Sequence, residues 1–185
     1  MAAGGCMRVL RSLRAGTPRP RGVPAPDATG PALSWIGEER IAISGVPSAR
    51  MVARLAQQGV THVVNCRPRA EVRLWGDLAA ERAAFGPGRV VHAPMQDHGL
   101  RQRPAVWAEA ACFAARVLAD QPQAGVLIHC TAGRRRSAML AYAVLRLRGH
   151  DRTEAAALVL RYRTEAILVP AYVRSVERWL ATAPG

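Results

Sequence analysis

The chain has 185 residues, half of them apolar, which is enough for one domain with a real hydrophobic core. Charged residues make up 21% and leave a formal net charge of +13, which first suggests a nucleic acid or a membrane surface as partner. All 26 basic residues are arginine, however, and asparagine occurs once. That profile is typical of coding in a GC-rich bacterium, so codon usage is an alternative cause of the charge.

Bulk features of the sequence exclude several classes of protein. No apolar run approaches the ~18 residues that a membrane-spanning helix needs. The four cysteines, at positions 6, 66, 112 and 130, show no short regular spacing and no CxxC pair. This pattern argues against a disulfide framework and against a thiolate zinc site, and it favours a reducing cytoplasm.

Residues 1–32 differ in composition from the rest of the chain. They hold five arginines and two proline-rich stretches, and Asp27 is their first acidic residue. An arginine-rich, acid-poor start is also typical of a transit peptide or of attachment to a membrane surface. The simpler interpretation is a disordered N-terminal tail followed by one catalytic domain over residues 33–185.

From position 34 onward the pattern is that of a globular domain. Short β-branched or apolar runs predict strands over residues 41–43, 60–65, 89–93 and 126–129. Longer periodic segments, bounded by proline and glycine, predict helices over residues 46–58, 74–85, 104–120, 137–148, 151–163 and 170–181. Strands that alternate with helices predict an α/β fold, with a central, mostly parallel sheet flanked by helices.

The most informative segment runs from Val126 to Ser137 and reads VLIHCTAGRRRS. It leads from a buried strand, through small and polar residues, into a helix. Ligand sites in open α/β sheets lie at the carboxyl ends of strands. A loop that precedes a helix N-terminus directs its backbone N–H groups inward, and the helix dipole adds positive potential. The segment therefore predicts a site for an oxyanion.

Four residues in this segment suit phosphoryl chemistry. Gly133 allows a positive φ or a close backbone approach, and Arg136 can hold two phosphoryl oxygens at once. The local field lowers the pKa of the Cys130 thiol, so that its thiolate can attack phosphorus, and Ser137 can donate a hydrogen bond to the sulfur. Taken singly, an inert buried thiol and a solvated arginine run are simpler interpretations. The combination favours a nucleophilic site.

The loop resembles that of the cysteine-dependent protein tyrosine phosphatase superfamily, which reads H-C-x5-R-[ST]. The likeness is greatest to the dual-specificity branch, covers about residues 35–180 and includes the strand VTHVVN over residues 60–65. The Ala-Gly-Arg centre and the Arg-Ser-Ala exit of the loop are also similar to phosphatidylglycerophosphate phosphatases of mitochondrial type. The resemblance implies a dual-specificity phosphatase-like fold and hydrolysis of a phosphomonoester through a phosphocysteine, with no cofactor and no metal.

The resemblance also implies roles for individual residues. His129 would brace the loop through hydrogen bonds. The residues around the bound phosphate would be Thr131, Ala132, Gly133, Arg134, Arg135 and Arg136. The general acid would lie about thirty residues before the cysteine, on a loop after a strand.

Asp97 fits the position of that general acid. It lies 33 residues before Cys130, after the strand predicted over residues 89–93, and Gly99 nearby would allow the loop to move. In the second step Asp97 would act as base on the attacking water. A turn residue is the simpler interpretation, and His98 is the alternative acid.

Two further sets of residues need an interpretation. Cys66 follows the strand expected beside residues 126–129, where it is either a small packing residue or a thiol that traps oxidised Cys130. The tryptophans are spread over the chain and are interpreted as packing residues rather than a base-stacking platform. They are Trp35, Trp75, Trp107 and Trp179.

We expect the substrate to be a phosphorylated protein or an anionic phospholipid. Arg134 and Arg135 favour a substrate with additional negative charge, and also favour an anionic bilayer. We expect a protein tyrosine or dual-specificity phosphatase, with a phospholipid-headgroup phosphatase as the alternative. A non-catalytic phosphate-binding module is a second alternative, against which the intact set of Cys130, Arg136 and Asp97 argues. Nucleic acid is not an expected partner, and a monomer is expected.

Overall fold

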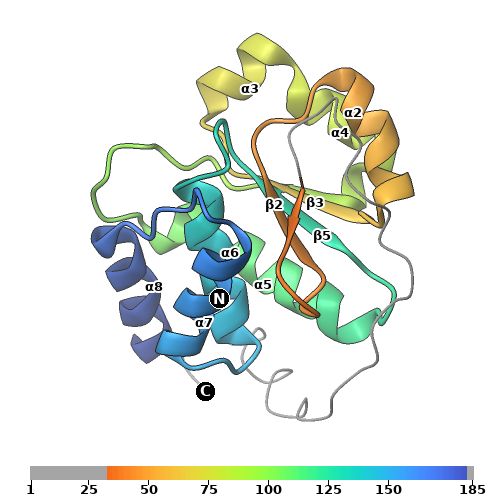
Figure 1. Ribbon diagram of the computed structural model, residues 1–185. Helices are drawn as coiled ribbons and strands as arrows, with labels where there is room; N and C mark the ends of the chain where they lie inside the picture. The colour runs from red at the N-terminus through yellow and green to blue at the C-terminus, as the bar shows by residue number, and fades with distance from the viewer. Residues whose placement is uncertain (1–32, 183–185) are drawn as a thin grey trace.

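The computed structural model describes residues 33–182 of the chain (Figure 1). The tail predicted over residues 1–32 lies outside the described residues. Within them the chain forms a central sheet with helices on both faces, as the alternation of strands and helices predicts.

The sheet has five strands in the order β1-β2-β5-β3-β4, and every neighbouring pair except β1–β2 is parallel. The strands are β1 (Ser34–Trp35), β2 (Ile41–Ser44), β3 (His62–Asn65), β4 (Val90–His92) and β5 (Val126–His129). The four parallel strands confirm the predicted strands, with bounds that differ by up to two residues, and β3 lies beside β5 as expected. The short antiparallel β1 was not predicted from the sequence.

Seven α-helices are described in residues 33–182. They are α2 (Ala49–Leu55), α3 (Arg69–Trp75), α4 (Asp77–Phe85), α5 (Pro104–Asp120), α6 (Arg136–Leu147), α7 (Arg152–Tyr162) and α8 (Pro170–Thr182). Short 3-10 turns follow α2 at Ala56–Gln58 and precede β4 at Pro87–Arg89. The last four helices confirm the predicted helices within one or two residues at each end.

Alternate strand residues separate two hydrophobic layers. Ile41, Ile43 and Ile128 pack under α5 and α6, while Ala42 and Leu127 pack on the other face with α2 and α4. Every residue of β2, β3 and β5 is buried, and the apolar residues of these strands are interrupted only at their ends, by Ser44, His62, Asn65 and His129. Helices α7 and α8 cover the outer side of α6 (Figure 1).

The helix predicted over residues 74–85 is wrong in detail. Gly76 adopts a left-handed conformation with φ 68° and divides this stretch into α3 and α4. Helix α3 also begins earlier than expected, at Arg69, because Pro68 precedes it with extended backbone. Helix α2 begins later than expected, because the Ser48 side chain accepts the Met51 N–H and caps the helix there.

The packing role expected of the tryptophans is correct for Trp107, which is fully buried and meets Trp179 edge to face with ring centroids 5.2 Å apart. It is wrong for Trp75, whose side chain is 72% exposed at the end of α3. Among the cysteines, Cys66 and Cys130 are free and buried. In residues 33–182, no helix is both long enough and apolar enough to cross a bilayer.

Candidate active site

The loop between β5 and α6 lies at the carboxyl edge of the sheet, as predicted. Gly133 has φ 68° there, and a Cβ atom on it would come within 2.4 Å of the Ser44 backbone of β2. The Thr131 carbonyl accepts the Val46 N–H at 3.1 Å and ties the loop to the segment after β2. Glycine is therefore required at position 133 for both its conformation and its space.

The sulfur of Cys130 is surrounded by hydrogen-bond donors at the start of α6. The Gly133 N–H donates to it at 3.2 Å, and the Ser137 hydroxyl lies 3.4 Å away. Burial by itself raises the pKa of the Cys130 thiol. Hydrogen bonds from Ser137 and Gly133, together with the charge of Arg136, outweigh that effect and lower the pKa below its ordinary value. The site thus favours a thiolate.

The guanidinium of Arg136 is buried beside this sulfur. Its Nη2 donates to the Thr131 hydroxyl at 3.1 Å, and its Nη1 lies 3.5 Å from the Met95 carbonyl oxygen. Its Nε has no hydrogen-bond partner in the part of the chain that the structure describes. A buried guanidinium with a free N–H is a binding group for an oxyanion.

Asp97 lies on the segment 95–103 that connects β4 to α5, at the same edge of the sheet. Its Oδ1 is 3.1 Å from Arg135 Nη1, and its Oδ2 is 3.7 Å from Arg136 Nε. The structure thus brings Asp97 to the loop between β5 and α6 (residues 130–135), which we call the phosphate loop, as the sequence predicts. Glu109 and Asp120, the other acids between positions 90 and 130, lie on α5.

Tyr172 of α8 contacts the segment that carries Asp97, a role that no sequence pattern indicated. Its hydroxyl accepts the Gly99 N–H at 3.1 Å. The same hydroxyl lies 3.3 Å from Asp97 Oδ1 and 3.2 Å from the Gln96 carbonyl oxygen, to either of which it can donate. Because the Tyr172 side chain is fully buried, it fixes where this loop can lie.

Glu71 of α3 is a second residue that the sequence did not reveal. Its carboxylate accepts hydrogen bonds from the Thr131 hydroxyl at 2.5 Å and from Arg67 Nε at 3.0 Å, and lies 3.9 Å from Arg136 Nη1. Burial raises the pKa of this carboxyl, but the two hydrogen bonds and the nearby arginine charges lower it overall. The spacing of Arg67 and Glu71 is that of an i,i+4 helical pair, which is a weak sequence signal.

A buried polar network joins the ends of β5 and β3 to α4, next to the loop. His129 Nε2 lies 2.7 Å from Glu81 Oε1, and both side chains are fully buried. Asn65 Nδ2 donates to Glu81 Oε2 at 3.1 Å and to Asp77 Oδ2 at 2.8 Å. Neither ring nitrogen of His129 meets the geometry of a hydrogen bond within residues 33–182, so its bracing role stays a prediction, with Glu81 on α4 as a partner that the sequence did not indicate.

Cys66 lies next to Cys130 at the carboxyl ends of neighbouring parallel strands. The residues before them, Asn65 and His129, are register partners, and the Cys66 N–H donates to the His129 carbonyl at 2.8 Å. Burial raises the pKa of the Cys66 thiol well above its ordinary value, and the nearby Cys130 adds to the effect. Adjacency suits a disulfide partner, but the redox role of Cys66 stays a prediction.

The remaining residues of the loop lie at its outer surface. Thr131, Ala132 and Arg134 are exposed and Arg135 is half-buried. Arg134 Nε lies 3.2 Å from the Glu165 carbonyl oxygen, in the link between α7 and α8. No group of three or more His, Cys, Asp or Glu side chains within residues 33–182 is placed to hold a metal ion.

Comparisons with solved structures identify the fold. No protein-family model and no curated protein matches the sequence. Tk-PTP in its active form matches 82% of this chain and 98% of its own, with 23% identity and a TM-score of 0.68.

Two further matches come from related phosphatases. PTPMT1 matches 80% of this chain and 93% of its own, with 20% identity and a TM-score of 0.66. Kinase-associated phosphatase matches 85% of this chain and 98% of its own, with 17% identity and a TM-score of 0.68. The chain therefore has the fold of the cysteine-dependent protein tyrosine phosphatases and their dual-specificity relatives.

Proposed function

We propose that the protein is a metal-independent phosphomonoester hydrolase of the protein tyrosine and dual-specificity phosphatase type, acting through a phosphocysteine. The arrangement around Cys130 carries this proposal. The Cys130 sulfur, with its lowered pKa, lies at the N-terminus of α6, and the buried Arg136 nearby has an Nε–H that makes no hydrogen bond within residues 33–182. These are the groups that a nucleophile and a phosphoryl oxyanion need.

In the first step the Cys130 thiolate attacks the phosphorus and the ester P–O bond breaks. Arg136 and the backbone N–H groups of the loop stabilise the charge on the phosphoryl oxygens. Asp97 donates a proton to the leaving oxygen. Its contact with Arg136 supports this role, because a phosphate held by that guanidinium would lie next to the carboxyl group.

In the second step Asp97 accepts a proton from the water that attacks the phosphocysteine. The S–P bond breaks, and the sulfur leaves as a thiolate. Ser137 lies 3.4 Å from this sulfur and would donate a hydrogen bond to it as it departs. No metal is required by this scheme, since the arginine and the loop amides supply the positive charge.

A phosphoprotein is the first candidate substrate, in line with the fold. A phospholipid headgroup is the second, and exposed apolar side chains beside the site favour it. The solved structure of PTPMT1 in complex with PI(5)P, which matches 76% of this chain at 19% identity, contains a lipid of that class. The cytoplasmic location and the monomeric state of the protein stay predictions.

A head-to-head assay tests the proposal. A phosphotyrosine peptide, a phosphoserine peptide and anionic phospholipid phosphates are compared, with vanadate as inhibitor. We expect vanadate-sensitive phosphate release from at least one substrate, and none from Cys130→Ser, which still binds phosphate. Anion binding by the wild-type protein with no turnover of any of the substrates would instead identify a non-catalytic phosphate-binding module.

A further inference from the structure

The large apolar side chains that the described surface exposes are unevenly distributed. They are Leu74, Trp75, Leu100, Ile167, Leu160 and Tyr162. The first four lie on α3, on the segment 95–103 and on the link 163–169 between α7 and α8. The other two lie on α7. Isolated exposed apolar residues are ordinary, but a set gathered in one region needs an explanation.

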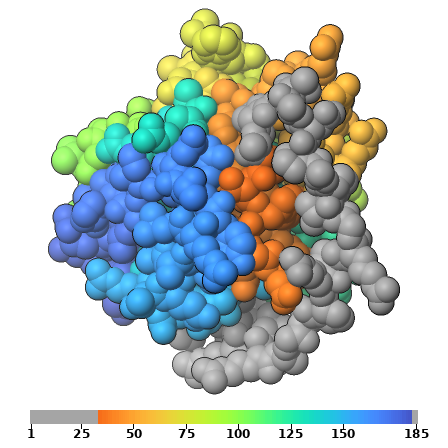
Figure 2. Space-filling view, in the orientation of Figure 1, coloured from red at the N-terminus to blue at the C-terminus, as the bar shows by residue number. Residues whose placement is uncertain are grey.

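All three of these segments contact the phosphate loop. Helix α3 and the segment 95–103 do so through the carboxylates of Glu71 and Asp97. The link does so through the Ile167 N–H, which donates to the Arg134 carbonyl at 2.8 Å. Figure 2 shows the teal phosphate-loop region at the surface between yellow α3, the green segment and the blue link. The apolar side chains therefore belong to segments that surround the mouth of the proposed active site.

These side chains protrude from the surface and do not line a groove. Leu74 is 80% exposed, Trp75 72% and Leu100 67%, so solvent surrounds each of them. Trp75 is the last residue of α3, and the left-handed turn at Gly76 follows it. A protruding apolar side chain can be buried on all sides when it inserts among lipids. Tryptophan and leucine are typical of segments that insert at a bilayer interface.

The charge on the same segments is positive. Their exposed arginines are Arg69, Arg73, Arg101 and Arg103, and Arg134 of the phosphate loop that they surround is exposed as well. Their carboxylates are already paired with arginines: Glu71 with Arg67, Asp97 with Arg135 and Glu165 with Arg163.

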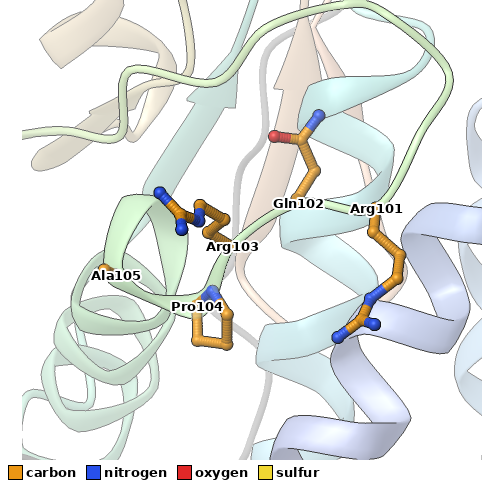
Figure 3. A pocket seen from close by; sticks show the side chains of 5 residues that line it. All are labelled: Arg101, Gln102, Arg103, Pro104 and Ala105. Atoms are coloured by element: carbon orange, nitrogen blue, oxygen red, sulfur yellow. The ribbon is translucent and has the colours of Figure 1, made fainter.

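Arg101 and Arg103, which precede α5, do not form a pocket for one small anion. They flank Gln102 in a hollow of about 610 Å³, and their guanidinium groups point away from each other (Figure 3). Separated arginines of this kind suit an extended anionic surface.

We propose that this rim, defined by Leu74, Trp75 and Leu100 with the five exposed arginines, docks on an anionic phospholipid bilayer and turns the phosphate loop towards phosphomonoester headgroups there. The identity of the substrate rests on the proposed hydrolase, whereas the docking itself does not. An acidic phosphopeptide would pair with the arginines but would leave the protruding apolar side chains in water, so the observations favour the bilayer.

Binding of the full chain to vesicles tests the proposal. We expect co-sedimentation with phosphatidylglycerol–phosphatidylcholine vesicles and not with phosphatidylcholine alone. The double variant Leu74→Gln/Trp75→Gln should bind at least about tenfold more weakly, because insertion contributes through buried apolar area. Leu160→Gln, which changes an exposed leucine on α7 outside the rim, is the matched control and should bind like the wild type.

Tryptophan fluorescence gives an independent measurement. Vesicles should shift the emission of the wild type to shorter wavelength, and Trp75→Phe should lose that shift while keeping most of the binding. Vesicle binding by the double variant equal to that of the wild type would overturn the proposal. A shift caused by an acidic phosphopeptide and not by vesicles would also overturn it, and would assign the rim to a protein partner.

Turnover of a soluble aryl phosphate separates the two proposals. If the wild-type protein binds vesicles through the rim but does not hydrolyse the aryl phosphate, the docking surface stands and the proposed hydrolase fails. If it hydrolyses the aryl phosphate and the double variant binds vesicles normally, the hydrolase stands and the docking surface fails.

Discussion

His129 Nε2 lies 2.7 Å from Glu81 Oε1, and neither side chain is accessible to solvent. The pair joins the residue before the nucleophile to helix α4, on the far side of the sheet from α6. Asn65 donates to the same carboxylate and connects it to β3. We infer that this buried network positions the phosphate loop.

Removal of Glu81 should destabilise the protein. Glu81→Ala leaves His129 buried without the carboxylate beside it, and removes one of the two carboxylates to which the Asn65 amide donates, so we expect a loss of about 3–5 kcal/mol in the free energy of unfolding, measured in urea. Glu81→Gln should cost less, because it still offers a hydrogen-bonding oxygen. Glu109→Ala, an exposed change on α5, should stay within about 0.5 kcal/mol of the wild type. Equal stability of Glu81→Ala and Glu109→Ala would contradict the bracing role.

The reactivity of Cys130 should depend on pH with an inflection below that of an ordinary thiol. Only the thiolate is alkylated, so the rate of iodoacetamide reaction rises with pH through the thiol pKa. That pKa is lowered by Ser137 and by Arg136. Ser137→Ala removes the hydroxyl hydrogen bond, and the inflection should therefore move to higher pH. Both proteins carry Cys66→Ser, and modification at Cys130 is measured by mass spectrometry. An inflection at the same pH with and without Ser137→Ala would contradict the role of Ser137 in lowering the Cys130 pKa.

Replacement of Asp97 should affect poor leaving groups most. Asp97→Asn cannot donate the proton, so kcat for an alkyl phosphate should fall about 10²–10⁴-fold, and less for an aryl phosphate with an acidic leaving group. His98→Asn tests the alternative acid and should change both rates little. An unchanged alkyl-phosphate rate in Asp97→Asn would remove Asp97 from the mechanism.

Tyr172 allows a sharper form of the same test. Because its hydroxyl contacts Asp97 and Gly99, Tyr172→Phe should lower kcat for the alkyl phosphate without a matching change in KM. A positioning residue acts through the group that it positions, so Tyr172→Phe should have almost no further effect in Asp97→Asn. Additive losses in the double variant would mean that Tyr172 has a separate role.

Mild peroxide should join Cys66 to Cys130. Peroxide converts the Cys130 thiolate to a sulfenic acid, and the Cys66 sulfur then attacks it with release of water. Neighbouring parallel strands place their residues at a separation that a disulfide spans, but the raised pKa of Cys66 slows its attack. Peptide mapping without reductant should show the bridge, and in Cys66→Ser the sulfinic form of Cys130 should appear instead. Mapping that shows no bridge would leave Cys66 as a packing residue.

Local features of the sequence predicted much of this fold. The parallel strands are β-branched or apolar runs, and Pro104 marks the start of α5. The break between α3 and α4 was harder to predict, since a single glycine inside a helical pattern is often tolerated. The two residues of β1 form a strand only because β2 pairs with them, which no local pattern reports.

Some residues of the candidate site were likewise predictable from a local pattern, and others were not. Cys130, Gly133 and Arg136 lie close together in one loop, so their spacing in the sequence alone predicted them as site residues. Glu71 and Tyr172 reach the site from α3 and α8 through tertiary contacts, which a single sequence does not encode as a local pattern. The exposure of Trp75 was mispredicted for a related reason, since burial depends on what packs over a helix end.

Direct detection of the covalent intermediate tests the central claim. Asp97→Asn should slow hydrolysis of the intermediate, so it is mixed with an aryl phosphate, quenched rapidly in acid and analysed by peptide mass spectrometry. We predict one phosphoryl group on the peptide that contains Cys130, and none after Cys130→Ser. Phosphate release by Cys130→Ser at the wild-type rate, or phosphorylation at another residue, would contradict the account.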